Sequence, residues 1–156
     1  MTADVEAGKF AGAVSLGRVT VDLETGTDAL VWSLDSQEAT VDAGRDAWIV
    51  SLSDLTANVE ADRDALAWSI GPLDGSVFAS EYALAAGWDN VIVNLQGDRG
   101  AFGWAYGTLG GFVISAAGFS GAVAIGNVDV GIQACSGAFA VAAGRVNVLA
   151  TVGGSV

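Results

Sequence analysis

The chain has 156 residues, of which 52% are hydrophobic, and a formal net charge of −12. This length fits one domain, and the negative charge disfavours nucleic acid and anionic membrane surfaces as partners. The sequence has no histidine, no Gly-Lys-Ser/Thr phosphate loop and no dinucleotide fingerprint, which removes histidine-based catalysis and the common nucleotide sites. We therefore expect no enzymatic activity and no cofactor.

Targeting signals are not evident in the sequence. The first residues, Met1 to Glu6, lack the basic region and apolar core of a signal peptide. Residues 100–128 are uncharged and long enough to cross a bilayer as a helix, but their glycines and their place in a repeat argue against one. Cys135 is the single cysteine, so no internal disulfide can form. We expect no membrane insertion, and the compartment stays open.

An 18-residue period runs through the chain and dictates its architecture. Asp28, Asp46 and Asp64 lie 18 residues apart, and residues 3–7 already match residues 57–61. With Ala117 as a single inserted residue, the units are 9–26, 27–44, 45–62, 63–80, 81–98, 99–116, 118–135 and 136–153. We number the positions of each unit 1 to 18 and predict one solenoid domain over residues 1–156.

Each unit contains two predicted strands separated by two turns. Positions 9–10 and 18–1 are rich in glycine, aspartate, asparagine and serine, which are typical of turns. The first strand carries large apolar residues at positions 4, 6 and 8, and the second carries them at positions 11, 13, 15 and 17. We expect both sets to face the core. Gln37, at position 11, does not fit this pattern.

Residue sizes suggest how the two strands meet. Position 6 is expected to face position 13, where Trp32 meets Ala39, and the other tryptophans at position 6, Trp68 and Trp104, meet glycines. Dense packing requires such a match, and tryptophans alternate with smaller residues along position 6, which avoids stacking them directly. The predicted fold is an all-β, parallel two-sheeted β-solenoid of about eight rungs. An antiparallel β-meander is the alternative.

On this assignment, positions 3, 5 and 7 form a flat outer surface of small, uncharged residues. Surfaces of this kind usually mark interfaces, and lateral packing on another copy is the expected use. Ice binding and burial by another part of a longer chain are alternatives. The predicted interface residues are Ala29, Val31, Ser33, Ala47, Ile49, Ser51, Ala65, Ala67, Ser69, Ala83 and Ala85.

Two further groups of residues are candidates for binding. Stacked carboxylates at Asp28, Asp46 and Asp64 are weak calcium candidates. Arginines at positions 45 and 63 alternate with them and favour a solvated face, so we expect no metal. Near the two ends, Val5, Val146 and Val148 lie in frame. Open rungs at these places predict end-to-end polymerisation with further copies of the chain.

Family resemblances add to this interpretation. The segments 41–47, 59–65 and 95–101 (VDAGRDA, VEADRDA and LQGDRGA) resemble the degenerate repeats of filamentous-haemagglutinin-type bacterial surface proteins. That resemblance implies a parallel β-helix at the cell surface or outside the cell, serving as an adhesin shaft or filament. Residues 26–30 and 44–48 resemble half of a calcium-binding nonapeptide repeat, and the architecture is similar to that of polymerising bactofilins.

From residues and resemblance together we predict a structural, self-assembling β-solenoid that forms a filament or surface layer. A shaft segment of a bacterial adhesin and an ice- or calcium-binding module are the alternatives.

Overall fold

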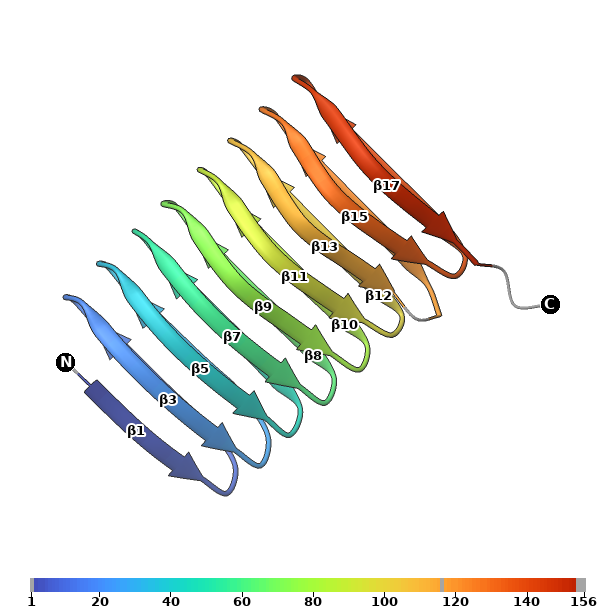
Figure 1. Cartoon of the computed structure of the whole chain (residues 1–156). Helices are drawn as coiled ribbons and strands as arrows, with labels where there is room; N and C mark the ends of the chain where they lie inside the picture. Colours follow the sequence, from blue (N-terminus) through green and yellow to red (C-terminus); the bar gives the residue numbers. More distant parts are fainter. Residues whose placement is uncertain (1, 116, 154–156) are drawn as a thin grey trace.

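The computed structural model describes residues 2–115 and 117–153, without the side chains at positions 112, 114 and 115. The described residues form seventeen strands and no helix. The chain alternates between two stacked sheets, a nine-stranded sheet A and an eight-stranded sheet B (Figure 1). All described strand pairs are parallel, which confirms the predicted β-solenoid and excludes the antiparallel meander.

The odd-numbered strands form sheet A and the even-numbered strands form sheet B. Sheet A contains β1 (Thr2–Ala7), β3 (Val19–Thr25), β5 (Gln37–Ala43), β7 (Leu55–Ala61), β9 (Leu73–Ala79), β11 (Val91–Gly97), β13 (Leu109–Ser115), β15 (Val128–Ala134) and β17 (Val146–Val152). Sheet B contains β2 (Ala11–Ser15), β4 (Ala29–Ser33), β6 (Asp46–Ser51), β8 (Asp64–Ser69), β10 (Tyr82–Gly87), β12 (Gly100–Ala105), β14 (Phe119–Ala124) and β16 (Gly137–Ala142).

Strand pairing follows the sequence period. Ala29 pairs with Ala47 and Ala47 pairs with Ala65, each 18 residues on. Between β12 and β14 the offset becomes 19, since Gly100 pairs with Phe119. The extra residue, Ala117, lies in the connection before β14, so the next turn of the solenoid regains the same register.

The core lies between the sheets, and it differs from the prediction on one side. Sheet A turns positions 11, 13, 15 and 17 inward, as predicted from its alternating pattern. Sheet B turns positions 3, 5 and 7 inward, and Val31 and Ile49 are 0% exposed. The predicted outer surface of sheet B is therefore wrong, because all eleven of its residues are buried. They are Ala29, Val31, Ser33, Ala47, Ile49, Ser51, Ala65, Ala67, Ser69, Ala83 and Ala85.

The connections explain which face of sheet B is inside. Each sheet B strand ends on an inward residue such as Ser33, and after three connecting residues the chain enters sheet A on another inward residue, Gln37. The inward residues of the strands are therefore at odd positions in both sheets, and the even period of 18 preserves this on every rung. Facing sheets lie about 10 Å apart, so the leucines and valines of sheet A leave room only for small residues opposite.

The size matching is real, but it involves other pairs. A Cβ added to Gly87, at position 7, would lie 2.7 Å from Cγ2 of Val91, at position 11. Alternation then places position 5 opposite position 13, so that a large residue on one sheet meets a small one on the other. Such pairs are Val31/Ala39, Ile49/Ala57, Ala85/Val93 and Ala122/Val130, whereas Ala67/Gly75 and Gly103/Gly111 each join two small residues. Trp32 does not contribute to this core, because it points outward from sheet B.

Buried serines stabilise the turns that leave sheet B. The hydroxyl of Ser33 donates a hydrogen bond to the carbonyl of Asp35 at 2.9 Å, and Ser51 donates to the same carbonyl from the next rung at 3.1 Å. Ser69 donates to the Gly71 carbonyl at 2.5 Å. These bonds compensate the burial of each hydroxyl, which explains why serine is accepted in an otherwise apolar core.

Gln37 remains the exception on sheet A. It is 3% exposed and lies between Val19 and Leu55 in its row, and neither its amide nitrogen nor its amide oxygen has a hydrogen-bond partner among the described residues. A buried amide without partners costs stability.

We expect Gln37→Leu to stabilise the protein by about 1–3 kcal/mol, because it removes the unpaired amide and continues the row of apolar residues. Denaturant unfolding measures this change. Gln96→Leu, on the exposed side of β11, is the matched control and should shift stability by less than about 0.5 kcal/mol. A loss of stability in Gln37→Leu would show that the amide makes a bond the core needs.

The orientation of sheet B can be tested with two neighbouring residues of β6. Ile49→Ala should cost about 2–5 kcal/mol, because it opens a cavity in the core. Trp48→Ala removes a larger side chain that is 48% exposed, and it should cost less than about 1 kcal/mol. Unfolding at low protein concentration compares the two. A larger loss for Trp48→Ala would reverse the assignment of the two faces.

Candidate functional site

The outer side of sheet B carries a continuous surface of large apolar residues. It consists of positions 4, 6 and 8, and we call it the apolar face. All five tryptophans of the chain lie on it. Its members, turn by turn, are Gly12, Val14, Leu16; Leu30, Trp32, Leu34; Trp48, Val50, Leu52; Leu66, Trp68, Ile70; Leu84, Ala86, Trp88; Phe102, Trp104, Tyr106; Gly121, Val123, Ile125; and Phe139, Val141, Ala143.

Many of these side chains are open to solvent although they are apolar. Leu16 is 78% exposed, Trp88 is 54% exposed and Tyr106 is 51% exposed. Val14, Trp48 and Val141 are exposed as well, whereas Trp32, Trp68 and Trp104 have intermediate exposure. Positions 4, 6 and 8 contain no charged residue in any rung. A contiguous apolar patch of this size usually marks a binding surface rather than scattered exposed residues.

Aromatic rings pack against each other and against glycines on this side of the sheet. Trp88 stacks on Tyr106 with ring centroids 5.9 Å apart and meets Trp104 edge-on at the same distance. A Cβ on Gly121 would lie only 2.3 Å from Cζ of Phe139, so this ring covers the glycine. The face is therefore ordered by its own contacts, which limits the side-chain entropy lost when something binds.

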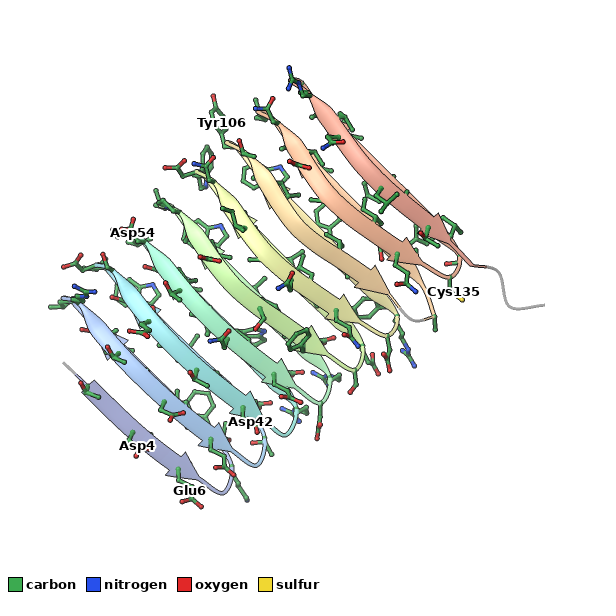
Figure 2. The ribbon with its side chains drawn as sticks, viewed as in Figure 1. Asp4, Glu6, Asp42, Asp54, Tyr106 and Cys135 are labelled. Carbon is green, nitrogen blue, oxygen red and sulfur yellow. The ribbon has the colours of Figure 1, made fainter. Side chains whose placement is uncertain are left out.

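The outer side of sheet A has the opposite character in its first half. Asp4, Glu6 and Asp42 project from it toward the viewer in Figure 2. Further exposed carboxylates on β3 to β9 continue this acidic surface, which carries no lysine or arginine because all six basic residues lie in the connections. The further carboxylates are Asp22, Glu24, Glu38, Glu60 and Asp74. The solenoid thus has one apolar face and one acidic face.

Arginines and aspartates alternate along the edge where the chain enters sheet B. Arg45 binds Asp28 through two nitrogens, at 2.8 and 2.5 Å, and Arg63 pairs with Asp46. Each arginine also lies near the aspartate that follows it, with Arg63 Nε 3.4 Å from Asp64. Hydrogen bonding and attraction by Asp28 raise the pKa of Arg45 above its ordinary value. This ladder links successive rungs through charge.

The three weak calcium candidates all belong to this ladder. The structure brings Asp28, Asp46 and Asp64 into one row, in which arginines pair with both oxygens of Asp28 and with one oxygen each of Asp46 and Asp64. Among the described residues no group of three histidine, cysteine, aspartate or glutamate side chains is arranged to hold a metal ion. Asp46 is 5% exposed, and its second carboxylate oxygen is buried without a partner in the described structure.

The remaining predicted site residues lie at the edges of sheet A. Val5 is on β1 and pairs with Leu23, whereas Val146 and Val148 are on β17 and pair with Val128 and Val130. Cys135 lies in the connection after β15 and is partly buried (Figure 2). The sequence interpretation missed the apolar face, although the row of tryptophans at even positions was a signal for it.

Comparisons of the chain with models of protein families, with curated protein sequences and with solved structures gave no match. Within residues 2–115 and 117–153, no helix has the length and apolar character needed to cross a membrane.

Calcium should not stabilise the unaltered protein, because Arg45 and Arg63 already neutralise the aspartate row. We expect thermal unfolding curves in chelator and in millimolar Ca²⁺ to overlay. The variant Arg45→Gln with Arg63→Gln frees the same carboxylates and serves as the comparison. A higher midpoint in Ca²⁺ for the unaltered chain would indicate a site through ligand linkage.

Proposed function

We propose that this protein is a structural β-solenoid that assembles with other copies of itself through the apolar face into a filament or surface layer. The observation that carries the proposal is the uncharged apolar face, which spans all eight strands of sheet B. Covering water-exposed tryptophan, leucine and isoleucine side chains with a partner lowers the free energy, because apolar surface is removed from water.

Charge supports a second copy as the partner. The chain has a net charge of −12, which opposes association between copies wherever their acidic surfaces approach. The acidic face is on the outer side of sheet A, with the full thickness of the solenoid between it and the apolar face. Two copies that meet through their apolar faces keep both acidic faces in water and far apart.

The size of the face also supports this partner. Eight strands spaced about 4.8 Å apart, with about six residues across, give a surface of roughly 700 Å² per copy. A stable protein–protein interface buries about 800 Å² per partner. The apolar face therefore approaches a standard interface without any contribution from other surfaces.

Contact along the stack extends the proposal from a pair to a filament. In the described structure β1 and β17 are the outer strands of sheet A, and β2 and β16 are the outer strands of sheet B. Outer strands offer backbone groups to a further strand. A copy that continues the 18-residue register there would lengthen both sheets, which makes Val5, Val146 and Val148 the proposed end-to-end contacts.

Charges placed on the apolar face should separate the copies. We expect Trp48→Lys with Ile70→Lys to lower the native mass and to remove lateral association, leaving only the end-to-end contacts, since buried unpaired charges are costly at an interface. Far-UV circular dichroism should keep its β signal, because both side chains point away from the core. Native mass measurement and electron microscopy of the same samples report the association.

The matched control carries the same charge change on the other side of the molecule. Thr56→Lys with Asn58→Lys alters exposed residues of β7 on sheet A, and it should assemble like the unaltered chain. A parent that remains a single chain at high concentration would contradict self-assembly. Equal assembly by both variants would show that copies meet through another surface.

A further inference from the structure

We infer that two copies dock their apolar faces in antiparallel orientation, with the solenoid axes pointing in opposite directions. This inference rests on the proposed association through the apolar face and adds its geometry. Face-to-face pairing of identical copies requires a two-fold axis in the plane of the interface. The strands of each sheet are stacked side by side with little twist (Figure 1), so two orientations are natural. The axis lies either along the strands or along the solenoid.

Position 6, the central row of the apolar face, distinguishes these orientations. From the first rung to the last it contains Val14, Trp32, Val50, Trp68, Ala86, Trp104, Val123 and Val141. With the two-fold axis along the solenoid, each rung meets itself, and all three tryptophans of this row face their own copies. With the axis along the strands, the first rung meets the last, and each tryptophan faces a small residue.

The antiparallel pairs match large residues with small ones in the central row. Trp68 faces Ala86 of the second copy, and the other two tryptophans face valines. The further pairs are Trp32/Val123 and Trp104/Val50. A complete overlap of eight strands produces this match, whereas a shift of one rung places tryptophans against one another. Interfaces pack as densely as protein interiors, so this complementarity selects the full overlap.

In the neighbouring row at position 4, the pair formed by the first and last rungs matches a large residue with a small one. Gly12 faces Phe139, Leu66 faces Leu84 in a pair of equal size, and Leu30 faces Gly121, which the Phe139 ring of its own copy covers. The fourth pair, Trp48 and Phe102, brings two aromatic rings together, an arrangement that offset or edge-on contact stabilises.

The antiparallel pair keeps the aspartates of position 2 apart. Position 2 carries Asp28, Asp46 and Asp64, and in the antiparallel pair these residues face Phe119, Gly100 and Tyr82. The aspartates of one copy therefore meet none of the other.

Spin labels on two turns test the orientation in the full chain. In a Cys135→Ser background, Gly17→Cys labels the first rung at a place where an added Cβ meets nothing within 4 Å. Asp89→Cys labels the equivalent turn of the fifth rung. Both labels lie on the same edge of sheet B, so the separation between copies depends on which rungs face each other.

The antiparallel pair predicts unequal separations. The Gly17 labels should lie roughly 35 Å apart, because seven rungs of about 4.8 Å separate them. The Asp89 labels should lie close to about 10 Å apart, since the fifth rung faces the fourth across the two sheets. Dipolar coupling between labels measures both in samples whose native mass is that of two chains, because in a filament the first rung of an end-to-end neighbour would lie beside the Gly17 label.

Each outcome decides between the proposals. A long separation at Gly17 with a short one at Asp89 supports the antiparallel pair. Equal separations at the two sites would overturn it in favour of the parallel pair, while leaving association through the apolar face intact. Long separations at both sites in an associated sample would place the contact on another surface. A single-chain mass without coupling would overturn the proposed function as well.

Discussion

The structure depends on the parallel register of 18 residues. Because each strand pairs with the strand one unit further on, a residue type that recurs in the sequence becomes a row along the stack. An even period also keeps every row on the same side of its sheet. Ala117 shows how strict this is, since one extra residue inside a strand would turn the following side chains over. It lies in a connection instead, and Ser120 and Ala122 of β14 are still buried.

The sequence was sufficient to predict the parallel solenoid, the turns and the inward side of sheet A. It predicted the wrong side for sheet B, because residue size was used as the measure of burial. Trp48 and Leu66 were placed inside because they are large, whereas Ala47 and Ala65 fill the core. The number of residues in each connection decides the side, and a three-residue connection from Ser33 to Gln37 keeps the alternation intact.

This reversal changes where the function must be sought. The predicted interface residues are core residues, and the predicted core aromatics form the apolar face. The two sides of sheet B therefore have separate roles. Its inward alanines pack on the leucines of sheet A and stabilise the stack, and the outward tryptophans are not needed for this. The aspartate row was recognised in the sequence, but only the structure shows that Arg45 and Arg63 bind it. Side-chain pairing of this kind depends on rotamers that a sequence pattern does not specify.

The alternation of tryptophans along position 6 needs a cause outside the single chain. Crowding between neighbouring rungs does not require it, because Trp88 and Tyr106 occupy adjacent rungs at position 8 and stack with ring centroids 5.9 Å apart. Adjacent aromatic rings are thus compatible with the spacing of the strands. The inward pairs do not require the alternation either, since position 6 points away from the core. Antiparallel docking of a second copy does require the alternation, because each tryptophan then faces a smaller residue of the other copy. The alternation at position 6, which first suggested size matching inside the solenoid, is better explained by size matching between two solenoids.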